Sequence, residues 1–301
     1  MSTYLILGAS SDLGCELIRN IIDDAQKKAE ETEIYAHFGT HSECLMEIAR
    51  QNQIECGILS ELAKRNQTEY EMPGENGEQS ESECEILGEN GEQNASERVR
   101  LAEKCGYVNQ LHNSKISMYL LQADLSSEDS VHSLIELMSE HEICPDHVIH
   151  FAADRYQYNR LSDWNPERVQ KNMQIQVWSF ADILRKLMPE MQKKKDASAV
   201  FMLSSVINDA PKYLSEYVCV KHALYGLMQS MAADCEDTSV RICAVAPSMI
   251  ETKFVKGIGR KLREMAAEAS PLGRNLTPEE VTPVIYELMQ QGRNGQIHSW
   301  T

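Results

Sequence analysis

Short apolar runs alternate along the chain with longer stretches in which apolar residues recur every three or four positions. Six short runs are rich in branched or aromatic residues, which favour strands: Tyr4–Leu7, Ile34–Phe38, Ser117–Gln122, His147–Phe151, Ala199–Leu203 and Val240–Val245. Strands that alternate with helices predict a parallel sheet covered on both faces, with ligands bound at the carboxyl ends of its strands. We therefore expect an α/β fold of three layers, α/β/α, around a central doubly wound parallel sheet.

One acidic stretch interrupts this alternation. Residues 71–97 contain nine glutamates, no lysine or arginine, and few residues to bury. This composition is typical of disorder, and we expect an acidic, disordered insertion whose flanks reach residues 66–114. We interpret it as a surface insertion between the second and third predicted strands, with a partner-binding segment as the alternative.

Composition and charge limit the class of protein. The 301 residues, 42% of them hydrophobic, can form one core, so we expect residues 1–301 to be a single domain that carries the insertion. A net charge of -17 argues against a nucleic-acid or anionic-membrane partner. The nine cysteines include no CxxC pair, and no signal peptide precedes the first strand pattern, so we expect reduced thiols and a cytoplasmic location.

The turn after the first predicted strand has features of a phosphate-binding loop. In TYLILGASSDLGCEL, Gly8 directly follows the strand and Gly14 lies where an apolar helix begins. Backbone N–H groups of this loop, with the hydroxyls of Ser10 and Ser11, could hold a pyrophosphate at the helix N-terminus. Asp12 occupies a position where such loops usually have glycine, and its carboxylate must point away from the phosphates. A plain strand-to-helix turn is the alternative for this motif alone.

A tyrosine and a lysine share one helix face later in the chain. Ser205 ends a predicted strand, Tyr217 opens a helix twelve residues on, and Lys221 follows one turn later. A phenol has an unperturbed pKa of about 10, and a neighbouring cation lowers it, which suits proton transfer near neutral pH. A chance YxxxK helix is the alternative, and the serine at the strand end together with the glycine loop argues against it.

With these motifs in this order, the chain resembles the short-chain dehydrogenase/reductase family, and specifically its compact single-domain members. LGASSDLG is similar to the family's TGxxxGxG loop, and AVAPSMIET, residues 244–252, is similar to its PGxxxT segment. The resemblance covers nearly the whole chain apart from the acidic insertion. It implies one NAD(P)-binding Rossmann-like domain.

The resemblance also implies the site residues. Tyr217 would be the general acid in reduction, or the base in oxidation, and Lys221 would lower its pKa and bind the nicotinamide ribose. Ser205 would orient the substrate oxygen, while Asn172 would hold a water that links Lys221 to solvent. The implied cofactor-binding residues are Gly8, Ser10, Ser11, Asp12, Leu13, Gly14, Thr40, Asp124, Leu125, Ala152, Ala153, Tyr217, Lys221, Pro247, Ile250 and Thr252.

The chain departs from the compact pattern at two further places. HFAA, residues 150–153, replaces the usual NNAG and is more like the HxAA of larger sugar-nucleotide epimerases and dehydratases. Those proteins have a wider serine-to-tyrosine spacing and a C-terminal substrate domain, whereas only 80 residues follow Lys221 here, which favours the compact group. The terminal NGQIHSWT also lacks the family's usual final glycines, where its last strand lies.

The residues after the second predicted strand bear on the cofactor. An acidic residue there would bond the ribose 2′-hydroxyl of NAD, but the chain has Gly39, Thr40 and His41 instead. Because Thr40, His41 and Ser42 could bond a phosphate, we expect NADP(H) in preference to NAD(H). We expect no metal site, and interpret His37 and His41 as ordinary loop histidines, because i, i+4 spacing at a strand end does not bring side chains together.

The predicted function is an NAD(P)(H)-dependent oxidoreductase that reduces a carbonyl or oxidises a secondary alcohol. The motifs are most similar to those of 3-oxoacyl-acyl-carrier-protein reductases, so the substrate could be an acyl thioester. A hydroxysteroid, sugar or polyol dehydrogenase is an alternative, and a non-catalytic NADP-binding scaffold or sensor is an alternative of another class. The resemblance implies a homodimer or homotetramer.

Overall fold

The computed structural model describes residues 1–59 and 115–300. Within these ranges the strands are β1 Ser2–Leu7, β2 Thr32–Phe38, β3 Glu55–Leu59, β4 Ile116–Gln122, β5 His147–His150, β6 Ala197–Met202, β7 Val240–Ala246 and β8 Ile297–Ser299. The α-helices are α1 Asp12–Lys28, α2 Glu43–Gln51, α5 Glu128–Glu140, α6 Pro166–Met173, α7 Ser179–Met191, α8 Ser215–Asp234, α9 Arg260–Ala269 and α10 Pro278–Gln291. Short helical segments are η1 Leu161–Asp163, η2 Gln174–Trp178, η3 Ser205–Ile207 and η4 Lys253–Val255.

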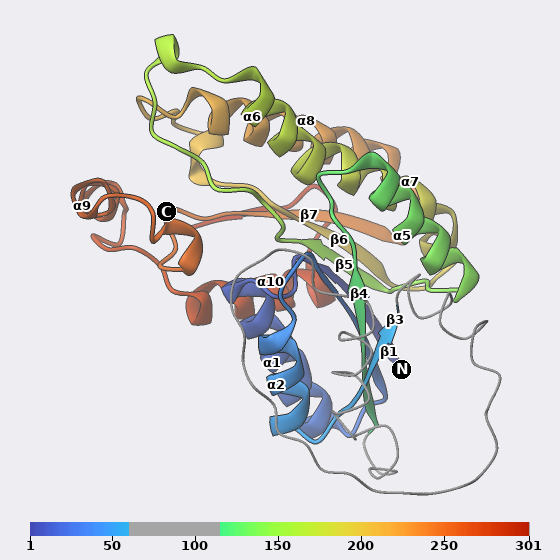
Figure 1. The fold of residues 1–301 in the computed structure, drawn as a ribbon. Coiled ribbons are helices and arrows are strands. Elements are labelled where there is room, and N and C mark those ends of the chain that lie inside the picture. Colours follow the sequence, from blue (N-terminus) through green and yellow to red (C-terminus); the bar gives the residue numbers. More distant parts are fainter. Residues whose placement is uncertain (60–114, 301) are drawn as a thin grey trace, which may run out of the picture.

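The strands form one parallel sheet in the order β3-β4-β2-β1-β5-β6-β7-β8 (Figure 1). The chain builds outward from β1 through β2 and then crosses to β5 on the other side of β1. This reversal leaves a crevice at the carboxyl ends of β1 and β5, where open α/β sheets bind ligands. The prediction of a three-layer α/β/α fold with a doubly wound parallel sheet is confirmed.

Both faces of the sheet are covered by helices. Helices α1, α2 and α10 lie on one face, and α5, α7 and α8 lie on the other (Figure 1). Strand β1 shows why the apolar runs are continuous: Leu5 and Leu7 pack into one layer, while Tyr4 and Ile6 pack into the opposite layer. Each of these six helices buries one stripe against the sheet, and in the described ranges no helix is both long and apolar enough to cross a membrane.

All six predicted strands occur, but the sequence patterns missed two. Strand β3 is a five-residue partner of β4 at the sheet edge, directly before the residues that are not described. Strand β8 forms because Asn294 and Gly295 turn the chain back along β7. Gly295 has φ +76° and donates its N–H to the Ile242 carbonyl at 2.8 Å. The predicted insertion, with its 66–114 flanks, lies outside the described residues.

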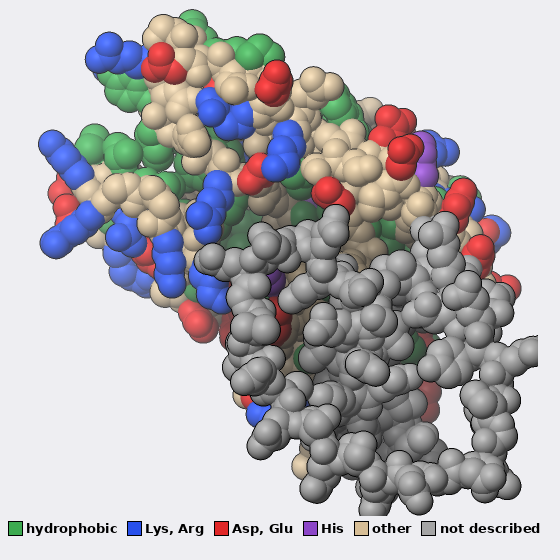
Figure 2. Space-filling view, viewed as in Figure 1, with side chains coloured by type: hydrophobic (Ala, Val, Ile, Leu, Met, Phe, Trp, Pro, Cys, Tyr) green, Lys and Arg blue, Asp and Glu red, His purple; other side chains and the backbone are tan. Residues whose placement is uncertain are grey.

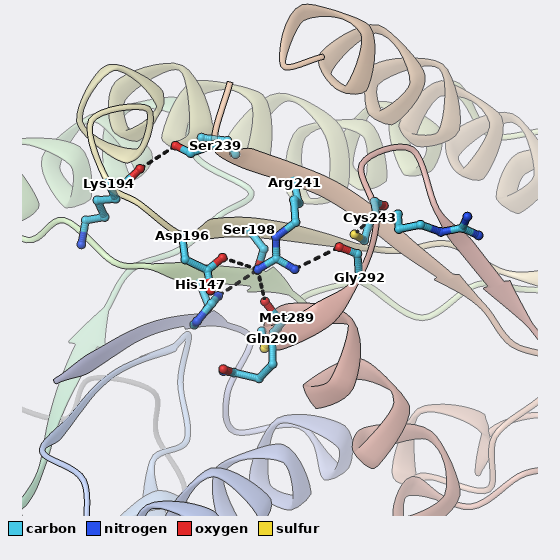
Figure 3. Close-up of polar contacts among 12 residues, drawn as sticks. His147, Lys194, Asp196, Ser198, Ser239, Arg241, Cys243, Met289, Gln290 and Gly292 are labelled. Carbon is cyan, nitrogen blue, oxygen red and sulfur yellow. Dashed lines mark hydrogen bonds and ion pairs between the residues drawn. The ribbon is translucent and has the colours of Figure 1, made fainter. Parts of the chain in front are cut away.

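The amino ends of the strands are tied to the end of α10 (Figure 3). The Arg241 guanidinium donates to the carbonyl oxygens of Met289 and Gly292 at 2.9 and 3.0 Å and pairs with Asp196. The Ser198 hydroxyl also donates to the Met289 carbonyl, at 3.0 Å. These bonds satisfy carbonyls that the helix end leaves open. This end of the sheet is therefore structural, and the opposite end is available for ligands.

Candidate active site

A cavity of about 1540 Å³ lies at the carboxyl ends of the strands. It is lined by most of the predicted site residues: Gly8, Ser10, Ser11, Asp12, Leu13, Thr40, Asp124, Leu125, Ala152, Ala153, Ser205, Tyr217, Lys221, Pro247, Ile250 and Thr252. Gly14 and Asn172 do not line it. The loops after β1, β2, β4, β5, β6 and β7 thus meet around one space, although they are far apart in the chain.

The two glycines of the opening loop are required by close backbone approaches. Gly8 has φ +75°, and a Cβ there would lie 2.5 Å from the backbone nitrogen of Ala152. A Cβ on Gly14 would lie 2.4 Å from the Ala9 carbonyl oxygen. Ser11 is the N-cap of α1, and its hydroxyl accepts the Gly14 N–H at 3.1 Å. The loop therefore presents the N-terminus of α1 to the cavity, an arrangement that fits a dinucleotide pyrophosphate.

Asp12 makes a long-range contact in place of the expected glycine. Its carboxylate accepts the backbone N–H of Lys253 at 2.5 Å and lies 3.6 Å from the Lys253 ammonium. It thus points away from the loop's own backbone and ties α1 to the segment after β7. The sequence indicated that Asp12 must turn away from phosphate, but not the partner to which it turns.

His37 is a buried bridge and not a loop histidine, which corrects the sequence interpretation. It ends β2 at 2% exposure, and its Nδ1 accepts the Gly8 N–H at 3.0 Å. Its Nε2 donates to the Ala123 carbonyl at 3.1 Å. Burial lowers the pKa of His37 to about 4, so the ring is neutral and can both accept and donate. His41 lies on the exposed loop beyond it.

Thr40 and Asp124, from the loops after β2 and β4, also line the cavity. Thr40 lies in the exposed loop after β2. The Asp124 carboxylate accepts the Ser126 N–H at 2.9 Å and the Ser126 hydroxyl at 2.7 Å, and its own N–H is donated to the Ser130 hydroxyl at 2.8 Å. Asp124 therefore shapes the start of α5 as well as the cavity wall.

Tyr217 and Lys221 lie together on α8, as their spacing predicts. The Lys221 ammonium is 5.7 Å from the centroid of the Tyr217 ring and donates to the Met202 carbonyl at 2.7 Å. The Ser204 hydroxyl, one residue before the predicted Ser205, lowers the pKa of the Tyr217 phenol. Both serines line the cavity, and Ser205 begins the short helix η3.

The electrostatics of this pair differ from the sequence expectation. Burial raises the pKa of Tyr217 to about 12, and the nearby Ser204 hydroxyl offsets only part of this shift. Burial also lowers the pKa of Lys221 to about 7. The expected lowering of the phenol pKa by a nearby cation is not seen in this structure, because loss of hydration is the dominant effect on Tyr217.

Asn172 lies behind the cavity, near the end of α6. Its amide donates to the Arg168 carbonyl at 3.2 Å and accepts from the Gln176 amide at 3.0 Å. Gln176 belongs to η2, a π-helical turn that joins α6 to α7, a feature often found at functional sites. The Gln176 side-chain oxygen is buried without a partner among the described residues. The water-holding role of Asn172 stays a prediction.

Sequence patterns missed the ion pair that holds the start of α8. Glu216, next to Tyr217, is 9% exposed and accepts two hydrogen bonds from Arg168, at 2.5 and 2.7 Å. It also accepts the Asn165 N–H at 2.8 Å, and the bonds from Arg168 lower the pKa of Glu216. These contacts fix α8 against α6. No local pattern signals them, because the partners are 48 residues apart.

An aromatic wall beside Tyr217 was also missed. Tyr156, from the loop after β5, stacks on the Tyr217 ring with centroids 4.4 Å apart and an interplanar angle of 27°. Phe254, from the segment after β7, lies 5.5 Å from Tyr156. Two loops from different strands therefore meet over the phenol.

The chain matches a known family model. Residues 93–297 match the model described as enoyl-(acyl carrier protein) reductase. The uncharacterised oxidoreductase YmfI of Bacillus subtilis is 26% identical over 188 residues, 61% of this chain and 76% of YmfI. The 3-oxoacyl-acyl-carrier-protein reductase FabG of Thermotoga maritima is 32% identical over 104 residues, which span 35% of this chain and only 42% of FabG.

Solved structures share the fold at low sequence identity. The angucycline C-6 ketoreductase LanV with bound NADP has a TM-score of 0.69 at 14% identity, covering 99% of this chain and 93% of LanV. L-sorbose reductase from Gluconobacter frateurii, complexed with NADPH and L-sorbose, has a TM-score of 0.67 at 15% identity, covering 99% and 94%. With the family match over 93–297, these findings establish that the chain belongs to the short-chain dehydrogenase/reductase family of NAD(P)-dependent oxidoreductases.

Proposed function

We propose that the chain reduces a carbonyl to a secondary alcohol, with Tyr217 as the proton donor and Ser204 as the hydroxyl that holds the substrate oxygen. The nicotinamide cofactor supplies the hydride. The observation that carries this proposal is the Tyr217 side chain at the cavity wall, one helical turn from Lys221, in a cavity that Ser204 also lines. The sequence prediction of Ser205 is kept as the alternative for the serine role.

The raised pKa of Tyr217 favours reduction over oxidation. With a pKa of about 12, the phenol is protonated at neutral pH and ready to donate. Lys221 is the group that can stabilise the phenolate left behind, because below its pKa of about 7 it is an ammonium that lies beside the ring. Oxidation of an alcohol requires Tyr217 to be a phenolate before the reaction begins. With a pKa of about 12, only a small fraction of Tyr217 is a phenolate below about pH 10.

NADP(H) remains our proposed cofactor. The loop after β2 has no carboxylate that would repel a 2′-phosphate, and the exposed Thr40, His41 and Ser42 offer donors to it. LanV binds NADP and the sorbose reductase binds NADPH, which supports this choice by analogy. Titrating the protein, with its thiols reduced, with NADPH and with NADH tests this preference. Tighter binding of NADH would overturn it.

The cavity lining favours an apolar substrate with an anionic part. Tyr156, which stacks on Tyr217, lines the cavity together with Phe254 and Met265. Around α9, Lys and Arg side chains gather on the surface (Figure 2), although the chain as a whole carries a charge of -17. An acyl thioester, whose carrier bears phosphate, combines both properties, and the local similarity to FabG supports it. A hydroxysteroid would match the aromatic wall but not the basic surface around α9. A sugar or polyol is polar and matches the aromatic wall least well.

The non-catalytic scaffold is the second candidate, and the oligomeric state stays a prediction. A scaffold would not need a phenol and an ammonium side by side in a cofactor-sized cavity, so the site argues for an enzyme.

A homodimer or homotetramer is compatible with Trp178, which is 44% exposed on η2. Light scattering of the purified chain measures this directly.

The deciding experiment is a substrate panel with the Tyr217→Phe variant. Ketones and acyl thioesters are offered with NADPH, and its absorbance is followed. We expect turnover of at least one apolar ketone or thioester, and a loss of roughly 10³-fold in kcat for Tyr217→Phe with little change in NADPH affinity. Full turnover by Tyr217→Phe would overturn the role of the phenol.

A further inference from the structure

Two cysteines from different helices touch beside the glycine loop. Cys15 lies in the first turn of α1, and Cys44 lies in the first turn of α2. The Cys15 thiol donates to the Cys44 sulfur, and the two sulfur atoms are 2.9 Å apart. Cys44 also contacts the Ser10 carbonyl at 3.5 Å. A dithiol thus lies against the loop that borders the cavity.

The two thiols have different environments. Cys15 is 6% exposed, and Cys44 is partly exposed. The hydrogen bond from Cys15, together with nearby Lys253, lowers the pKa of Cys44 to about 7, whereas the same contact and burial raise the pKa of Cys15. The reachable sulfur is therefore the one that ionises, and the buried sulfur keeps its proton. This is the division between an attacking and a resolving cysteine.

We propose that Cys15 and Cys44 are a modification site, a dithiol that a peroxide oxidises to an intramolecular disulfide. In the first step the Cys44 thiolate attacks one peroxide oxygen, the O–O bond breaks, and a sulfenic acid and hydroxide form. In the second step the Cys15 sulfur attacks the Cys44 sulfur, and the S–O bond breaks as the S–S bond forms. The departing oxygen leaves as water with the Cys15 proton. The two thiols lose two electrons, and hydrogen peroxide is reduced to two waters.

The disulfide would change the loop that borders the cavity. Bonded sulfur atoms are about 2.05 Å apart, so the two sulfurs must approach and Cys44 must give up its contact with Ser10. The starts of α1 and α2 would be pulled together on either side of that loop. If the loop holds the cofactor phosphates, as the proposed function assumes, the oxidised protein binds NADPH more weakly.

Peptide mapping tests the disulfide without reference to activity. The full chain is treated with hydrogen peroxide, its remaining thiols are blocked, and it is digested with trypsin. The sequence puts Cys15 in the peptide 1–19 and Cys44 in the peptide 29–50, so the linked pair has a distinct mass. We expect this linked peptide to dominate and to disappear in Cys15→Ser and in Cys44→Ser. The matched control Cys219→Ser, which removes an exposed cysteine, should retain it.

A second readout separates this inference from the proposed function. NADPH affinity is measured on reduced, oxidised and re-reduced protein, and we expect Kd to rise by roughly tenfold on oxidation and to recover with dithiothreitol. Cys44→Ser should not respond to peroxide. Absence of the linked peptide, with Cys44 instead oxidised alone, would overturn the dithiol. A linked peptide with unchanged Kd would overturn the coupling to cofactor binding. A reduced protein that binds no nicotinamide cofactor would overturn the proposed function and leave the disulfide result intact.

Discussion

At the residue scale, two adjacent serines after β6, Ser204 and Ser205, are candidates for the hydroxyl that holds the substrate oxygen. The motif spacing predicts Ser205, whereas Ser204, which is 8% exposed, is the serine that lowers the pKa of Tyr217. The backbone differs at the two positions: Ser204 is extended, whereas Ser205 begins the helix η3, so the two side chains leave the chain in different directions. A one-residue choice of this kind depends on where the strand ends, which spacing alone cannot resolve.

We expect Ser204→Ala to lower kcat by roughly 10²-fold, because it removes a donor to the substrate oxygen. Ser205→Ala is the matched variant and should lower kcat by no more than about threefold. Steady-state kinetics with a substrate from the panel measures both. The reverse order of effects would return the role to Ser205.

The pH dependence of the reverse reaction follows from the pKa of Tyr217. The phenol is protonated below about pH 12, so oxidation of the alcohol needs a form whose fraction rises tenfold per pH unit through the neutral and mildly alkaline range. We expect the kcat of oxidation to rise steadily from about pH 7 to pH 10, while reduction is not limited by Tyr217 in that range. Rates in both directions at constant ionic strength measure this. A plateau of oxidation below about pH 9 would show that the phenol ionises more easily than this structure indicates.

At the scale of elements, one contact joins the first helix to the segment after β7. Asp12 holds the Lys253 N–H at 2.5 Å, and Lys253 opens η4, which carries Phe254 to the aromatic wall. The glycine loop and the wall around the substrate position are therefore connected through a single carboxylate. This explains how the chain can replace a glycine of the family motif with an acid.

We expect Asp12→Ala to raise the Kd of NADPH about fivefold, because the loss of a partly exposed, charge-assisted hydrogen bond corresponds to about 1 kcal/mol. KM for the carbonyl substrate should rise as well, since η4 loses its anchor. Asp23→Ala, an exposed acid on the same helix, is the control and should change neither value. Fluorescence titration of NADPH and steady-state kinetics give the two measurements. Equal effects of the two substitutions would contradict the contact.

At the scale of the whole molecule, three histidines are buried in the strands. Burial lowers the pKa of His37 to about 4, of His147 to about 4 and of His150 to about 3. Each ring is neutral in the fold and takes part in packing or hydrogen bonding; His147, for example, bonds Ser198 at 2.9 Å (Figure 3). In the unfolded chain the same rings have a pKa of about 6.5.

These histidines predict a loss of stability in mild acid. As the pH falls below about 6.5, the unfolded chain binds protons that the folded chain cannot bind until about pH 4, so the free energy of unfolding decreases. Each histidine contributes about 1.4 kcal/mol per pH unit, and the three together about 4 kcal/mol per unit. Urea unfolding at pH 7.5, 6 and 5 measures the slope. We expect His147→Gln to reduce it by about one third, whereas His132→Gln, at an exposed position, should leave it unchanged.

The sequence by itself determined the architecture and most of the cavity lining. Six strands could be predicted because a parallel sheet buried on both faces requires continuous apolar runs, and Gly8, Gly14, Tyr217 and Lys221 could be predicted because their chemistry depends on local spacing. Strand β3 was missed because five residues at a sheet edge carry little pattern. Strand β8 was missed because a turn at Gly295, rather than terminal glycines, brings the chain back to β7.

Only the tertiary structure decided which distant residues meet. It joined Asp12 to Lys253, Glu216 to Arg168, Tyr156 to Phe254 and Cys15 to Cys44. It also determined that burial, rather than the neighbouring ammonium, sets the pKa of Tyr217. The physical reason is common to all of these: local spacing carries periodicity and turn chemistry, whereas hydration and contact between loops depend on how the strands are ordered in the sheet.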